Sequence, residues 1–256
     1  FIFGTDEETL WRCMNRYNQI EEQADLGFAP DSSFPLTYAE KGLLQVKLHG
    51  PGWDDLPLQA GQALNVVPDK ATYAGHRLEE LLPVLDQSGV QYSQTEDSVM
   101  VMGVSKHSKD AAEGVNAIVG LAESLSLIQP HPALLFIADA VGEDATGEAL
   151  FGKITDEPSG DLSFNLATLV IDQEQSEIGV DIRIPVLVDK ENLVARLQEI
   201  AASYQLEYEE FDYLAPLYVP LDSPLVSSLM AVYQEETGDK TPAMSSGGAT
   251  FARTME

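Results

Sequence analysis

Two stretches of the chain alternate apolar and polar residues in the way that is typical of β-strands. In residues 42–50 every second residue is apolar, and the same alternation recurs in residues 178–188. The apolar positions are Leu44, Val46, Leu48, Ile178, Val180, Ile182 and Ile184. Because side chains of a strand point to alternate faces, both stretches are predicted to be strands with one buried face.

Three other stretches place apolar residues at helical spacing. They cover residues 76–89, 191–204 and 224–237. Their aligned apolar positions are Leu78, Leu81, Leu82, Leu85, Leu193, Leu197, Ile200, Tyr204, Leu225, Leu229 and Val232. Each is predicted to be an amphipathic helix, and Ser223 and Gly238 are predicted to cap the third.

The two ends of the chain predict shorter elements. Residues 1–4, FIFG, indicate the tail of a buried strand, and the following residues begin a helix with Leu10, Met14 and Tyr17 on one face. Near the other end, residues 245–256 place a Gly pair before a strand-like run. A short α/β segment is therefore expected at each end.

The middle of the chain repeats an order of elements. The first half has a strand-like segment at residues 63–75, the helix at 76–89 and then two short strands. The second half has the same order, with the strand at 178–188, the helix at 191–204 and the stretches LEYE and PLYV. The order predicts a duplicated α+β unit, with chance similarity as the alternative because the identity is low. The acidic, Gly-rich residues 139–152 are expected to form a surface loop between the halves.

Composition narrows the possible partners and compartment. The 256 residues include 14 Lys+Arg against 42 Asp+Glu, a net charge of -28 that repels nucleic acid and anionic membranes. With 44% hydrophobic residues the chain can bury a core, and no apolar run approaches the ~20 residues of a spanning helix. The single Cys13 cannot form an internal disulfide, which favours a reducing, cytoplasmic location. The first residue, Phe1, indicates a cut point, because no Met precedes it.

Carboxylates at the start of the chain are candidates for metal chemistry. Asp6, Glu7 and Glu8 follow the predicted strand and a Gly-Thr turn. One carboxylate there could bind a metal while its neighbour takes a proton from metal-bound water. The alternative is an acidic first turn that suits the helix dipole. Asp31 lies in a Pro-rich turn, where it either bonds its own backbone or joins Glu8 as a ligand.

Further candidates lie in loops and on the second strand. His107 sits in a small-residue loop, where it either approaches a ligand or is merely solvated. Arg183 could clamp a carboxylate at two points, or be an ordinary exposed cation. The Gly247–Gly248 stretch could present N–H groups to an anion, or be a plain loop. The other three histidines lack the spacing of a zinc motif.

The order of these motifs resembles one family. The segments FGTDEETLW, APDSSFP, LNVVPD, GVSKHSKDAAEGVNA, DIRIPV and SSGGATFAR resemble the di-zinc exopeptidases of metallopeptidase family twenty, and best its peptidase V type of bacterial dipeptidase. The resemblance covers nearly the whole chain. It implies an α/β catalytic domain, represented by residues 1–41 and 216–256, and a duplicated, ferredoxin-like α+β lid at residues 42–215.

The resemblance also implies roles. Glu7 corresponds to the general base, Glu8 and Asp31 to zinc ligands, and His107 to the residue that stabilises the oxyanion. The substrate-binding positions are Asn65, Arg183, Gly247, Gly248 and Thr250. The implied cofactor is a pair of zinc ions, with cobalt or manganese as substitutes. A small peptide is the implied substrate, and a monomer the implied state.

Some of the family pattern has no counterpart here. The upstream His-x-Asp motif, the bridging Asp and the last zinc-binding His are not in this sequence, so the chain resembles the middle of a longer enzyme. Two tetrahedral zinc ions need roughly eight ligand positions. We therefore expect the 256 residues alone to bind no di-zinc centre tightly and to hydrolyse no peptide. The alternatives for the parent are an N-acyl amino acid deacylase and a non-catalytic, lid-derived binding module.

Overall fold

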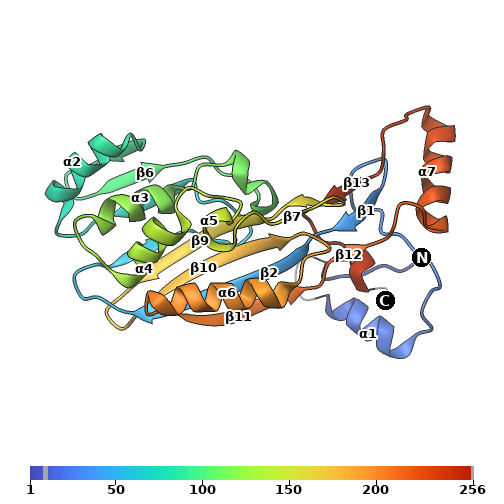
Figure 1. The fold of residues 1–256 in the computed structure, drawn as a ribbon, viewed down its shortest axis with the longest axis horizontal. Helices are drawn as coiled ribbons and strands as arrows, with labels where there is room; N and C mark the ends of the chain where they lie inside the picture. The colour runs from blue at the N-terminus through green and yellow to red at the C-terminus, as the bar shows by residue number, and fades with distance from the viewer. Residues whose placement is uncertain (8–10, 255–256) are drawn as a thin grey trace.

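A five-stranded antiparallel sheet forms the centre of the molecule. The computed structural model describes residues 1–7 and 11–254 (Figure 1). The strand order is β11-β2-β10-β9-β3. The strands are β2 (Gly42–Pro51), β3 (Leu58–Ala60), β9 (Ser163–Ile171), β10 (Gln175–Ile184) and β11 (Glu207–Leu214). The alternation predicted for β2 is confirmed, since Leu44, Val46 and Leu48 are fully buried.

The central strand β10 is buried on both faces rather than one. From Ile178 to Ile184 every residue is buried, including the two charged residues Asp181 and Arg183. One face packs into the hydrophobic core, while the 3₁₀ helix η1 (Ser108–Glu113) contacts β9 and β10. The alternation therefore located the strand correctly, but its polar face is covered by a loop from elsewhere in the chain.

A second, three-stranded sheet has the order β4-β6-β5 and lies at the far end from the chain termini (Figure 1). Its strands are β4 (Lys70–Tyr73), β5 (Tyr92–Gln94) and β6 (Val99–Met102). Helices α2 (Leu78–Ser88) and α3 (Ala117–Ser126) pack together beside it. Because α3 also contacts β9, one hydrophobic core is shared by both sheets.

The remaining elements of the middle region are short. They are α4 (Pro132–Leu135), the π-helical turn η2 (Phe136–Val141), α5 (Glu148–Phe151), β7 (Thr155–Asp156), β8 (Gly160–Asp161) and α6 (Lys190–Ser203). The surface loop expected at residues 139–152 is partly wrong. Two turns of helix fall within it, because Val141 and Leu150 are buried in the core.

Both predicted halves contain the order strand–helix–strand. In the first, β4 and β5 flank β6, whereas in the second β10 and β11 flank β2, a strand that lies outside the predicted half; every pairing is antiparallel. The central strand follows the helix in one half and precedes it in the other. PLYV does not complete the second half, because it pairs with a strand near the start of the chain.

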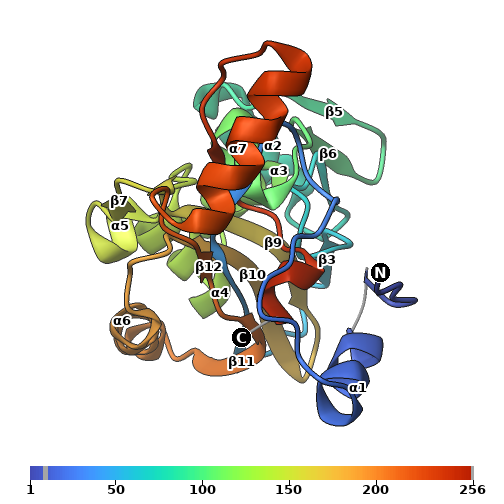
Figure 2. The ribbon, with the colours of Figure 1, turned by 90° about the vertical axis from the view of Figure 1, so that its right-hand side faces the viewer.

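Segments from both ends of the chain meet in a third sheet. Its order is β12-β1-β13, and β1 is antiparallel to β12 but parallel to β13. The strands are β1 (Thr37–Glu40), β12 (Leu217–Tyr218) and β13 (Met244–Ser246). Helices α1 (Arg12–Ile20) and α7 (Pro224–Thr237) lie apart from each other at this end (Figure 2). The division into a lid at 42–215 and two flanking segments stays a prediction.

Expectations for the chain ends have mixed outcomes. The α7 helix is confirmed, with the Ser223 hydroxyl accepting from the Val226 N–H and Gly238 in the left-handed region. The strand expected at residues 1–4 is wrong, since these residues are exposed and unpaired with any described strand. The strand-like run after the Gly pair is also wrong: β13 ends before it, and Phe251–Thr254 form a 3₁₀ turn, η3.

Candidate active site

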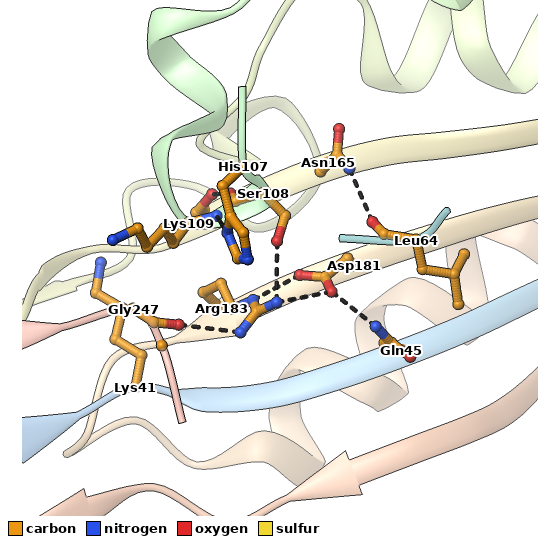
Figure 3. A network of polar contacts seen from close by, with 12 residues as sticks. Lys41, Gln45, Leu64, His107, Ser108, Lys109, Asn165, Asp181, Arg183 and Gly247 are labelled. Atoms are coloured by element: carbon orange, nitrogen blue, oxygen red, sulfur yellow. Dashed lines mark hydrogen bonds and ion pairs between the residues drawn. The ribbon is translucent and has the colours of Figure 1, made fainter. Parts of the chain in front are cut away.

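A row of polar side chains crosses the central sheet where it meets η1. Gln45, Asp181 and Asn165 are register partners on the adjacent strands β2, β10 and β9. Arg183 lies two residues after Asp181 and therefore on the same face. These polar side chains are the floor of the candidate site shown in Figure 3.

Arg183 is held by three different elements. Its Nε donates to Asp181 Oδ1 at 2.6 Å, and its Nη2 donates to Asp181 Oδ2 and to Ser108 Oγ, both at 3.0 Å. Its Nη1 donates to the Gly247 carbonyl at 3.0 Å. These bonds use four of the five N–H groups of the guanidinium. The predicted clamp is thus a buried ion pair that ties β10 to η1 and to the loop after β13.

His107 lies immediately above Arg183 in Figure 3. Its Nδ1 accepts from the Lys109 N–H at 3.1 Å, so the neutral ring carries its proton on Nε2. Partial burial, reinforced by the nearby positive charge of Arg183, lowers the pKa of His107 below its ordinary value of 6.5. The ring edge remains exposed. A neutral imidazole with a free Nε2–H can donate a hydrogen bond to an oxygen that gains negative charge.

Backbone bonds fix the loop that carries His107. The Ser108 N–H donates to the Asn65 carbonyl at 2.9 Å, and Val66 forms an isolated bridge with His107. The Asn165 amide donates to the Leu64 and Val66 carbonyls at 2.9 and 3.0 Å. Asn65 is an exposed residue, and its carbonyl is the group that contacts the loop of His107.

The predicted Gly247, Gly248 and Thr250 lie in one loop that two arginines hold. Arg183 bonds the Gly247 carbonyl, and Arg253 Nη2 donates to the Gly248 carbonyl at 2.9 Å. A Cβ on Gly247 would lie 2.6 Å from the Lys109 Cβ, so this loop touches the His107 loop.

Thr250 is engaged by a second buried ion pair. The Glu40 carboxylate accepts from Thr250 Oγ1 at 2.7 Å, from the Thr250 N–H at 3.1 Å and from Arg253 Nε at 2.8 Å. Burial lowers the pKa of Arg253, although its bond to Glu40 opposes that shift. With its hydroxyl occupied by Glu40, Thr250 orders the loop rather than presenting itself to a substrate.

The structure thus gathers the substrate-side predictions: His107, Arg183, Asn65, Gly247 and the loop through Thr250. Sequence reasoning missed Asp181, Ser108, Glu40 and Arg253, which position them. The sequence did contain a signal for Asp181, because the Asp-x-Arg spacing puts both charges on one face of the strand. Glu40 and Arg253 are 213 positions apart, and nothing local links them.

The metal-side predictions are not gathered in the same way. The Glu7 carbonyl accepts a bond from the Trp11 indole N–H, Asp31 is exposed in its turn, and Glu8 lies outside the described residues. Residues 1–7 and 11–254 contain no group of three His, Cys, Asp or Glu that could hold a metal ion. Asp31 has the right donor chemistry for zinc, but the described donors alone do not fit a di-zinc centre.

Comparison with known proteins gives sequence relatives over the whole chain. No family model matches. The chain is 34% identical to "Putative dipeptidase YtjP" of Bacillus subtilis, 29% to "Putative dipeptidase SH1171" of Staphylococcus haemolyticus and 31% to "Putative dipeptidase MW1694" of Staphylococcus aureus, in each case over 100% of its length. It spans only 59% to 60% of the length of these relatives.

Similarity to solved structures is weaker. The aminoacylhistidine dipeptidase of Vibrio alginolyticus aligns with a TM-score of 0.45 at 9% identity, over 86% of this chain and 53% of that one. The M20 family metallo-carboxypeptidase Sso-CP2 of Sulfolobus solfataricus aligns with a TM-score of 0.40 at 14% identity, over 95% and 55%. No described helix is long and apolar enough to cross a membrane. In sequence, the chain is therefore similar over its whole length to proteins that are named putative dipeptidases.

Proposed function

We propose that the protein containing this chain is a metal-dependent dipeptidase. The observation that carries the proposal is the meeting of His107, Arg183 and the Gly247 loop, three separate motifs of the resemblance, in one hydrogen-bonded group. Sequence identity to named dipeptidases over the whole chain supports it. The proposed metal is a pair of zinc ions, to which Glu8 and Asp31 contribute ligands together with groups beyond the described residues.

In this proposal the chain binds and orients the peptide. The exposed Nε2–H of His107 donates to the carbonyl oxygen of the scissile bond and stabilises its developing negative charge. The Gly247–Gly248 loop receives the terminal carboxylate, Arg183 positions that loop through the Gly247 carbonyl, and Asn65 bonds the peptide backbone. Zinc supplies Lewis-acid chemistry when bound. Glu7 takes the proton of the attacking water and passes it to the leaving amine.

The test uses the full-length gene product and a panel of dipeptides, N-acyl amino acids and longer peptides. We expect hydrolysis of dipeptides, loss of activity with a chelator and recovery with zinc. Glu7→Gln should lower kcat by at least about 100-fold, in the range of a lost general base, while zinc content stays unchanged. Full turnover by this variant with normal zinc content would contradict the role of Glu7. Hydrolysis of the N-acyl amino acids alone, with no turnover of dipeptides, would overturn the dipeptidase assignment.

A further inference from the structure

Four cationic residues contact the Ser246–Gly248 segment, although the protein has a net charge of -28. Arg183 and Arg253 bond the carbonyls of Gly247 and Gly248. The Lys41 N–H donates to the Ser246 carbonyl at 2.9 Å, and Lys109 packs against Gly247. Only 14 of the 256 residues are Lys or Arg, so this concentration of positive charge requires an explanation.

The two arginines have close, buried carboxylate partners, whereas the carboxylates around the two lysines are paired with them less tightly. Arg183 pairs with Asp181, and Arg253 pairs with Glu40. Lys109 Nζ lies 3.9 Å from the Asp110 carboxylate, at the limit of an ion pair. Lys41 forms no ion pair with any residue in the described part of the chain; its Nζ donates to the Asp161 carbonyl.

The ammonium of Lys41 is partly buried and has no ion-pair partner in the described part of the chain. Burial lowers the pKa of Lys41, although the negative charges of Asp156, Asp161 and Asp110 oppose that shift. A buried charge is ordinarily paired, because taking it out of water is unfavourable. An anion that binds next to Lys41 and Lys109 would offset this cost.

The two lysines border the proposed substrate position. The Lys109 N–H bonds the ring of His107, and its Cβ would meet a Cβ placed on Gly247. In Figure 3 the Lys41 side chain runs upward past Gly247, and the Lys109 side chain runs to the left above Gly247. A substrate whose terminal carboxylate meets the Gly247–Gly248 loop would therefore place its last side chain near both ammonium groups.

We propose that Lys41 and Lys109 form a subsite for a second carboxylate, so that the enzyme prefers dipeptides that end in Asp or Glu. This inference rests on the proposed dipeptidase function and adds a substrate class to it. The interaction is a charge attraction in a partly exposed site. Each lysine is expected to contribute a modest factor rather than an absolute requirement.

The experiment compares kcat/KM for Ala-Asp and Ala-Asn in the full-length gene product. We expect wild type to favour Ala-Asp by about tenfold, and Lys41→Gln or Lys109→Gln to reduce that ratio by about three- to fivefold, as for partly exposed charge pairs. The ratio should also fall with added salt. Lys106→Gln is the matched control, because Lys106 lies in the same loop but pairs with Glu113 at 3.1 Å; its ratio should remain that of wild type.

Two results would overturn the subsite. One is a wild-type ratio near one, and the other is an equal loss on both substrates in the lysine variants, which would indicate a structural role. Binding to the 256-residue chain is the readout that does not depend on turnover. N-acetyl-aspartate should shift the amide NMR signals of Gly247 and Gly248 at lower concentration than N-acetyl-asparagine, and Lys109→Gln should remove the difference. Equal binding of both compounds would exclude the subsite, whereas failure to hydrolyse any dipeptide would exclude only the proposed function.

Discussion

Asp181 and Arg183, two positions apart on β10, form a two-point ion pair inside the protein. Their bonds measure 2.6 and 3.0 Å, and the Arg183 and Asp181 side chains are only 5% and 0% exposed. Gln45 donates a further bond to Asp181 at 2.9 Å. Because Arg183 also bonds Ser108 and Gly247, this pair connects the stable central sheet to both loops of the candidate site.

Removing the charge of Asp181 should therefore destabilise the fold as well as the site. In Asp181→Asn the guanidinium of Arg183 remains buried without its counter-charge. Breaking a buried ion pair from one side costs about 3 kcal/mol or more of unfolding free energy. Urea unfolding of the 256-residue chain measures this loss.

The matched control is Glu177→Gln on the same strand. Glu177 pairs with Lys47 at 3.0 Å, but both side chains are about a quarter exposed, at 25% and 28%. Surface pairs of this kind contribute at most about 1 kcal/mol. Equal losses in the two variants would show that burial does not distinguish the pairs.

The lowered pKa of His107 predicts a pH dependence of stability. In the folded chain the pKa of His107 lies below 6.5. Between that folded pKa and 6.5, the unfolded chain therefore binds more protons than the folded chain. Unfolding free energy therefore rises with pH across that window, and the contribution is lost as pH falls toward the folded pKa. Urea unfolding from pH 5 to pH 7.5, beside an NMR titration of the ring, measures both quantities.

A variant distinguishes the contribution of His107 from that of His131. Burial also lowers the pKa of His131, so His131 contributes a pH dependence of stability with the same sign. In His107→Asn the side-chain oxygen can still accept the Lys109 N–H, so the loop is kept. The pH slope should become shallower without disappearing. An NMR pKa for His107 at or above 6.5 would contradict the prediction.

Much of the fold could be predicted from local patterns, whereas the support of the site could not. The alternation in β2 and the Ser223 and Gly238 caps of α7 are local signals, because each depends on residues a few positions apart. The burial of Arg183 is different: its polar strand face becomes interior only when η1 covers it, and Ser108 of η1 lies 75 positions earlier in the chain. The alternation within one strand does not indicate whether another segment packs against its polar face.

Family resemblance supplied the substrate-side residues of the site, and geometry changed their interpretation. Arg183 was expected as a clamp, yet four of its five N–H groups already have protein partners. Thr250 was expected at the substrate, yet Glu40 occupies its hydroxyl. Glu40 lies 210 positions from Thr250, and two of the three partners of Arg183 lie 64 and 75 positions away, so a local pattern could have revealed only the contact with Asp181.

Zinc binding by the 256-residue chain is a direct test of the metal-side expectation. The described residues offer no cluster of three metal-binding side chains. A tetrahedral zinc site needs about four ligands, and Asp31 with Glu8 supplies fewer. We expect less than one zinc ion per chain after gel filtration, measured by elemental analysis, and a higher content in the full-length gene product. Two tightly held ions in the 256-residue chain would contradict this.

A pair of adjacent glycines allows a final test of the contact between the two site loops. In Gly247→Ala the new Cβ would meet the Lys109 Cβ at 2.6 Å, closer than such atoms approach, so the Lys109 and His107 loop must move. Displacement of a catalytic group by about 1 Å can lower activity about 100-fold, and we expect kcat/KM for dipeptides to fall at least tenfold. In Gly248→Ala the nearest atom is Ser246 Oγ at 3.3 Å, a contact that a small shift of this hydroxyl relieves, so kcat/KM should stay within about threefold of wild type. NMR signals of the Lys109 amide and the His107 ring should shift in the first variant and not in the second. If both variants kept full activity and unchanged signals, the Gly247 loop would not position His107, and the two loops would act independently.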